Sequence, residues 1–160
     1  MEHFPLFLNL RGRRVLVVGA GLVAARKIAL LLAAGARVTV VAKVAHPSVQ
    51  ADAQRGQIEL HLCAFDAQWL QSVWLVIAAT SDEALNAAVA QAAAERQLWC
   101  NVVDDAARSS AQVPAIVDRA PLTIAISSGG AAPVIARRLR ERVEALIEPS
   151  IGWLTALARR

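Results

Sequence analysis

The apolar positions of the chain fall into two kinds of segment, short unbroken runs and longer stretches with helical spacing. The first run, residues 15–18, is too short and too rich in valine for a helix, which is typical of a strand buried on both faces of a parallel sheet. Residues 22–34 follow with helical spacing and stop at Gly35, which is suited to a helix C-terminus. Residues 37–42 form the next run and complete a strand-helix-strand unit. The residues at helical spacing on this helix are Val23, Lys27, Leu30, Leu31 and Ala34.

The same alternation continues through the rest of the chain and predicts an α/β fold with a Rossmann-like, doubly wound, mostly parallel sheet, followed by a β-hairpin and helices. We expect the Rossmann domain over residues 1–112 and the hairpin and helices over residues 113–160. The further predicted strands are 58–62, at an edge of the sheet, 73–80 and 98–105, the hairpin strands are 113–118 and 122–126, and the helices are 48–54, 82–96 and 134–147. The apolar stripe expected on the last helix is Ile135, Leu139, Val143 and Leu146.

A glycine turn follows the first predicted strand. Gly19, Gly21 and Ala24 match the G-x-G-x-x-G/A fingerprint, in which the first glycine permits a tight turn and the second lets the backbone approach a pyrophosphate. The small third residue lets helix and strand pack closely, and the free N–H groups of the helix start, at Leu22 and Val23, then face the phosphates. These five residues predict a dinucleotide site; a glycine turn that binds no nucleotide is the alternative.

Two other strand ends should reach the same edge of the sheet, where ligands bind in doubly wound folds. Ala79 and Thr80 end the run 73–80 there and are assigned to the cofactor. Lys43 and Val44 follow the second strand, where the fingerprint usually has an acid that binds the ribose. A lysine at this place either accepts the 2′-phosphate of NADP or is solvated, so these residues leave the choice between NAD and NADP open.

Two further segments carry candidate chemistry. Asp104 and Asp105 close the run 98–105 at the ligand edge, although a solvated turn is the simpler interpretation of either carboxylate. The small-residue loop Ser127–Gly130 leads into a helix with Pro133 in its first turn, which is a second place suited to an anion.

The composition narrows the classes of function. The formal net charge of +4 comes without an aromatic stacking platform or a nucleic-acid motif, so a small polyanion is the preferred partner. Because no apolar run reaches the about 18 residues of a membrane span and the N-terminus lacks a signal-peptide pattern, we expect a cytoplasmic protein with no membrane partner. Cys63 and Cys100 have neither zinc nor disulfide spacing and are expected to be buried thiols, and no metal site is predicted.

Five segments in a fixed order give a more specific signal. Together they resemble the N-terminal module of siroheme synthase, a precorrin-2 dehydrogenase and sirohydrochlorin ferrochelatase, and the resemblance runs from Phe4 to the end of the chain. The segments are Gly19–Lys27, Ala78–Thr80, Cys100–Asp104, Pro114–Arg119 and Ile126–Arg137.

The resemblance implies an enzyme that oxidises precorrin-2 to sirohydrochlorin with NAD and then inserts ferrous iron to give siroheme, both in one pocket. The family's catalytic carboxylate corresponds to Asp104, which could accept protons as a general base. The resemblance also implies a homodimer, a helical dimerisation segment after the hairpin and a possible fused methyltransferase domain. The residues expected to bind the tetrapyrrole and its carboxylates are Asn101, Arg119, Ser128, Gly129, Gly130 and Arg137.

Two departures from the family pattern bear on these expectations. Ala111 and Gln112 stand where the family usually has a bulky apolar pair, so one wall of the pocket is expected to differ. The family module continues further, so the chain is expected to be truncated within the dimerisation segment.

Two other functions would explain part of the sequence. The first is another NAD-dependent enzyme, but a short-chain dehydrogenase needs a catalytic tyrosine and the chain has none. The second is a non-catalytic redox-sensing module that only binds NAD(H). Such a module explains the glycine turn but not Asp104 or the Ser127–Gly130 loop.

Overall fold

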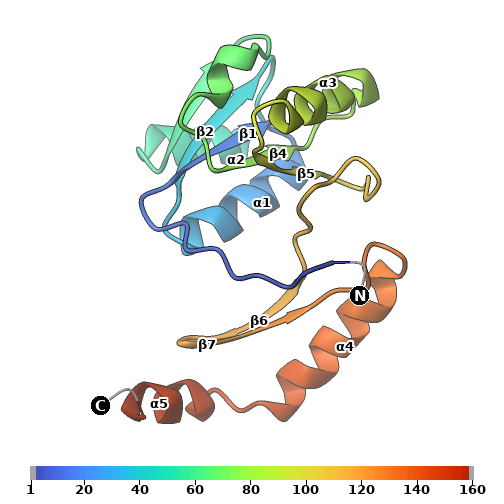
Figure 1. Ribbon diagram of the computed structural model, residues 1–160. Helices are drawn as coiled ribbons and strands as arrows, with labels where there is room; N and C mark the ends of the chain where they lie inside the picture. The colour runs from blue at the N-terminus through green and yellow to red at the C-terminus, as the bar shows by residue number, and fades with distance from the viewer. Residues whose placement is uncertain (1–2, 159–160) are drawn as a thin grey trace. The chain divides into compact units, whose positions relative to one another are not determined.

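The computed structural model describes residues 3–158 as two compact units (Figure 1). Residues 4–111 form the larger unit, and residues 112–158 together with His3 form the smaller one. Within the part of the chain that is described, no helix is both long and apolar enough to cross a membrane.

The larger unit contains a five-stranded sheet in which every pair of neighbouring strands is parallel, in the order β3-β2-β1-β4-β5. The chain winds outward from β1 in one direction and then returns to build β4 and β5 on its other side, which confirms the Rossmann-like fold expected from the sequence. The elements are β1 Arg14–Val18, α1 Leu22–Ala33, β2 Arg37–Ala42, α2 Pro47–Gln54, β3 Ile58–Leu62, the 3-10 helix η1 Ala67–Leu70, β4 Leu75–Ala78, α3 Glu83–Ala94 and β5 Trp99–Val102.

Helices cover both faces of this sheet, and Figure 1 shows α1 and α3 on opposite sides of it. Successive residues of a strand point to opposite faces, so the central strands β1 and β4 are apolar and buried along nearly their whole length. On one face Leu16 and Val76 pack in a cluster with Val89 of α3 and Leu70 of η1. The core therefore lies on both sides of β1 and β4, and the carboxyl ends of these strands share one edge of the sheet.

The buried stripe of α1 coincides only in part with the residues at helical spacing in the sequence. Ala24, Ile28 and Leu31 are buried, whereas Val23 and Leu30 are more than 40% exposed. The close packing that the glycine turn imposes at Ala24 rotates the helix so that its small residue, and not Val23, faces the sheet.

The smaller unit is a β-hairpin covered by two helices. Its strands, β6 Ala115–Arg119 and β7 Leu122–Ile126, are antiparallel as expected, and the helices are α4 Pro133–Leu146 and α5 Ser150–Leu157. The α5 helix comes so close to the hairpin turn that a Cβ at Gly152 would lie 2.6 Å from the Arg119 carbonyl oxygen. Only a glycine fits at this contact.

The apolar stripe predicted on α4 is mostly open to solvent. Ala136 is the one described residue of α4 that is fully buried, while Ile135 and Leu146 are 59% and 82% exposed. A two-stranded hairpin offers too little surface to cover the whole stripe. The larger part of the apolar face of α4 therefore has no cover within its own unit.

Candidate functional site

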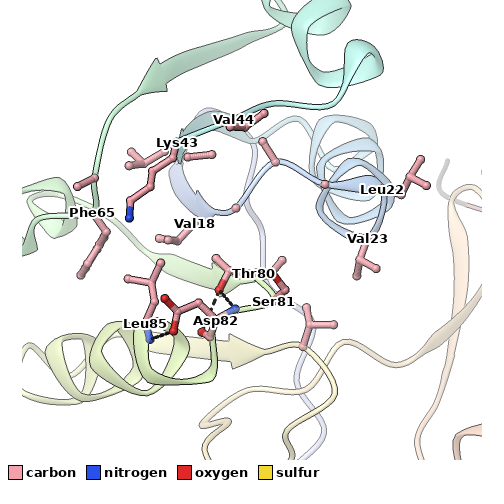
Figure 2. Close-up of a pocket in the computed structure, with 18 of the residues that line it drawn as sticks. Val18, Leu22, Val23, Lys43, Val44, Phe65, Thr80, Ser81, Asp82 and Leu85 are labelled. Carbon is pink, nitrogen blue, oxygen red and sulfur yellow. Dashed lines mark hydrogen bonds between the residues drawn. The ribbon is translucent and has the colours of Figure 1, made fainter.

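A cavity of about 530 Å³ lies at the carboxyl edge of the parallel sheet (Figure 2). It is formed where β1, β2, β4 and β5 end, which is the place where doubly wound folds bind their ligands. Of the nine residues that the sequence assigns to a cofactor, all except Ala24 line it. The residues concerned are Gly19, Gly21, Leu22, Val23, Lys43, Val44, Ala79 and Thr80.

The two glycines of the turn are required for different reasons. Gly19 has a φ of +106°, and a Cβ there would lie 2.3 Å from the carbonyl oxygen of Ala79, so the fold itself demands glycine. Gly21 has an ordinary extended backbone, and a Cβ there would meet nothing within 4 Å. Its missing side chain leaves open space beside the cavity, which is what a close-fitting pyrophosphate needs.

The start of α1 is suited to an anion. Gly21 is its N-cap, no side chain caps the helix, and its first turn holds no acidic residue. The first N–H groups of a helix have no partner within the helix, so those of Leu22 and Val23 remain available at the cavity. Ala24 is fully buried and packs inward, the role that the third position of the fingerprint requires.

The end of β2 adds a positive charge to the cavity. Figure 2 shows Lys43 extending from this strand end into the hollow, near Phe65 and Val18. Neither Lys43 nor its exposed neighbour Val44 is an acid that could bind ribose hydroxyls. The cavity thus suits the phosphates of a dinucleotide and leaves NAD and NADP both possible.

The turn after β4 is held by Asn86, which sequence reasoning missed. Asn86 is buried on α3, and its Oδ1 accepts a hydrogen bond from the Thr80 hydroxyl at 2.8 Å. Asp82 caps α3 by accepting a hydrogen bond from the Leu85 N–H at 3.0 Å. The available signal was an asparagine at a buried helical position, in phase with Val89 and Ala93.

The two carboxylates after β5 have different surroundings. Asp105 accepts a hydrogen bond from the backbone N–H of Arg108 at 3.0 Å and pairs with the Arg108 guanidinium, and the Arg108 N–H and then its side chain lower the pKa of Asp105. Asp104 has a φ of +60° and lines the cavity. Among residues 3–158 no group hydrogen-bonds or pairs with its carboxylate. Asp105 therefore stabilises the turn, and of the two residues only Asp104 lines the cavity.

Lys27 carries a charge that interacts with that of Asp104. The sequence did not assign Lys27 to the site. It is half-buried on α1, and burial lowers the pKa of its ammonium group while the negative charge of Asp104 opposes that shift. The two charges are therefore close enough to influence each other.

Residues 109–111 lie along β5 and hold the loop that carries Asp104. The hydroxyl of Ser109 accepts a hydrogen bond from the Val102 N–H at 2.9 Å, and that of Ser110 accepts from the Cys100 N–H at 2.8 Å. Asn101, expected to bind substrate, is buried and donates its side-chain N–H to the Ala111 carbonyl at 3.0 Å. It does not line the cavity.

The cysteines are only partly as expected. Cys100 is buried, and burial raises the pKa of its thiol to about 11, so it is unreactive. Cys63 is exposed in the cavity wall, and the prediction that it is buried was wrong because β3 ends one residue earlier, at Leu62. Among residues 3–158 no three His, Cys, Asp or Glu side chains gather as a metal site.

Comparison with known families and structures agrees with this geometry. Residues 6–115, more than half of the chain, match a family model described as "Putative NAD(P)-binding", and residues 119–146 match "Sirohaem biosynthesis protein central". The solved structure titled "SirC, precorrin-2 dehydrogenase" has a TM-score of 0.80 and 30% sequence identity, covering 96% of this chain and 76% of that one. The chain belongs to the siroheme synthase and precorrin-2 dehydrogenase family.

Two curated relatives of this family show how much of a siroheme synthase the chain represents. Siroheme synthase 1 of Serratia proteamaculans (strain 568) is 50% identical over all 160 residues, and siroheme synthase 1 of Yersinia enterocolitica serotype O:8 / biotype 1B (strain NCTC 13174 / 8081) is 53% identical over the same span. The chain spans about a third of the length of each, 34% in both cases.

The remaining residues that the family resemblance assigns to the tetrapyrrole lie in the smaller unit. Gly129 and Gly130 both have positive φ, and the Ser128 hydroxyl accepts a hydrogen bond from the Ala132 N–H at 3.1 Å, so this loop shapes the start of α4. Arg137 is exposed on α4. Arg119 instead donates to the carbonyl oxygens of Glu144 and Ile147 at 3.3 Å, which commits much of its guanidinium to the end of α4.

Proposed function

We propose that this chain catalyses the NAD-dependent oxidation of precorrin-2 to sirohydrochlorin in the cytoplasm, as a step of siroheme synthesis. The observation that carries the proposal is the free carboxylate of Asp104 on the wall of a cavity that is built for a dinucleotide. The family membership and the SirC likeness support the same reaction.

The cofactor is held by the turn and the strand ends around the cavity. The N–H groups at the start of α1, beside Gly21, would bind the pyrophosphate, and Lys43 would add a positive charge to the same cavity. NAD, when bound, supplies the two-electron acceptor of the oxidation. NAD is preferred over NADP on the family likeness, and a lower KM for NADP would contradict that part.

Asp104 serves as the general base of the oxidation. The reaction releases a proton, and the carboxylate of Asp104, which has no hydrogen bond or ion pair among residues 3–158, is available to accept it. Asp105 on the same turn lacks this freedom because Arg108 occupies it.

The carboxylates of the tetrapyrrole bind to basic and loop residues of the smaller unit. Ser128, Gly129 and Gly130 present backbone and hydroxyl groups, and Arg137 supplies a guanidinium suited to a bidentate pair. Arg119 is a weaker candidate because its donors already bond to α4, and Asn101 is weaker because it bonds to Ala111.

We further propose that the active form is a homodimer and that the full-length protein carries a fused methyltransferase domain. The exposed apolar side chains of α4 and α5 support an interface of the smaller unit. They are Ile135, Leu139, Leu146, Trp153, Leu154 and Leu157. Sedimentation of the purified chain as a monomer at micromolar concentration would contradict the dimer.

Insertion of ferrous iron into sirohydrochlorin is a second activity that we propose for the same site. Iron here is a substrate, and Asp104 would accept the protons that the macrocycle loses. Anaerobic incubation with sirohydrochlorin and ferrous iron should give the absorbance of siroheme faster than the reagents alone. An unchanged rate would remove this part and leave the dehydrogenase proposal intact.

The oxidation is tested with two matched variants, Asp104→Asn and Asp105→Asn. With precorrin-2 and NAD, we expect Asp104→Asn to form NADH at least about a hundredfold more slowly than wild type, while binding NADH normally. Asp105→Asn retains an acceptor for the Arg108 N–H and should keep most of its activity. Full activity in Asp104→Asn would refute its role, and NADH binding by wild type without oxidation would favour a non-catalytic NAD(H)-binding module.

A further inference from the structure

We propose that Asn86 is a positioning residue for the cofactor, holding Thr80 and the turn after β4 in the shape that the dinucleotide site needs. The inference rests on the cofactor site of the proposed function, but it does not depend on which substrate is oxidised.

The side chain of Asn86 bonds to three groups of one residue. Its Oδ1 accepts from the Thr80 hydroxyl at 2.8 Å and from the Thr80 backbone N–H at 3.3 Å, and its Nδ2 donates to the Thr80 carbonyl at 3.0 Å. The amide thus uses both its acceptor and its donor end, which no aliphatic side chain and no carboxylate can do. Thr80 is thereby clamped to α3.

The clamped turn forms one wall of the cavity and also supports the glycine turn. Thr80 and Ala79 line the cavity, and the position of a Cβ on Gly19 would be 2.3 Å from the Ala79 carbonyl oxygen and 3.1 Å from Thr80 Cγ2. The two turns are therefore in direct contact. A displacement of Thr80 would reshape both the wall and the support of the phosphate-binding backbone.

Packing alone does not account for an asparagine at this position. Asn86 is 8% exposed and shares its helix face with Val89 and Ala93, which are fully buried. A leucine would fill such a position without the cost of burying an amide, and asparagine is unfavourable within helices. What the asparagine adds is the set of hydrogen bonds to Thr80.

The test compares Asn86→Leu, which keeps volume in the core, with Asn86→Ala, which does not. NADH affinity is measured by fluorescence titration, and melting curves report the fold. We expect both variants to bind NADH roughly tenfold or more weakly than wild type, because bonds worth about 1 kcal/mol each are lost. The KM for NAD should rise by a similar factor. The kcat should change by less than about threefold, since the groups that react are untouched.

Thr39→Val is the matched control in the same unit. Thr39 is also a buried polar residue, its hydroxyl donates to Glu59 Oε2 at 3.3 Å, and it does not line the cavity. We expect its NADH affinity to equal that of wild type. A tenfold loss in Thr39→Val would overturn the proposal by showing that any lost buried hydrogen bond has this effect.

A double-mutant cycle with Thr80→Val tests whether Asn86 acts through Thr80. The combined loss of NADH affinity should be smaller than the product of the two single losses, because both variants remove the same hydroxyl contact. The proposal would be overturned if the losses of NADH affinity in the two single variants multiply in the double variant. It would also be overturned if Asn86→Leu binds NADH normally, including the case in which only Asn86→Ala loses affinity, or if both Asn86 variants unfold. Because NADH binding needs no precorrin-2, the inference survives if wild type binds NADH but does not oxidise that substrate.

Discussion

Gly21→Ala separates cofactor binding from folding in this protein. Gly21 has φ −81° and ψ −174°, a conformation that alanine adopts freely, and the added methyl group would meet no atom of the chain within 4 Å. The change therefore places one carbon in the open space beside the start of α1 and disturbs nothing else.

The two expected effects differ in size. Alanine is a poorer N-cap than glycine by up to about 1 kcal/mol, and the lower entropy of the unfolded chain returns about 0.4–1 kcal/mol. The melting temperature should thus move by less than roughly 4 °C. A pyrophosphate pushed away from the Leu22 and Val23 N–H groups loses at least one charge-assisted hydrogen bond of about 1.5–3 kcal/mol, which weakens NADH binding roughly ten- to hundredfold.

Fluorescence titration with NADH and a melting curve measure both effects on the same sample. Gly19→Ala is the contrast, because its positive φ and the 2.3 Å approach to Ala79 put the strain into the fold. It should lower the melting temperature sharply. Wild-type NADH affinity in Gly21→Ala would refute the placement of the pyrophosphate, and a large loss of stability would show that the fold itself needs Gly21.

Three further outcomes follow from the structure. In the native protein one thiol, Cys63, should react rapidly with a thiol reagent and be protected by NADH, whereas Cys100, with its pKa raised to about 11, should react only on unfolding. Burial lowers the pKa of Lys27, so its charged form costs stability below the folded pKa, and this cost fades as pH rises through that pKa toward 10.5. Lys27→Met should therefore raise the melting temperature at pH 7, with a gain that shrinks in alkali; a constant or growing gain would contradict this. Arg119→Ala removes bonds to two carbonyl oxygens at the end of α4 and should cost about 1.5–3 kcal/mol in urea unfolding. An unchanged midpoint would contradict this stabilising role.

The order of the elements and the cofactor turn could be predicted because both depend on local sequence. Alternating apolar runs and helical stretches predicted the parallel sheet and the hairpin, and the glycine spacing predicted which strand end faces the cavity. The inward faces of α1 and α4 were harder to predict, because periodicity shows that a helix has an apolar side but not how much of it the neighbours cover. Ala24 rather than Val23 faces the sheet, and Leu146 faces solvent.

The sequence by itself determined the fold class and the family, since strand runs, turn glycines and ordered motifs are properties of neighbouring residues. The tertiary structure decided what each residue of a motif contacts and which residues line the cavity. It separated Asp104 from Asp105 through the contacts of Arg108, and Gly19 from Gly21 through the approach of Ala79. Those distinctions depend on backbone geometry and on contacts that form only when the loops and strand ends meet, and residue type and spacing carry no record of them.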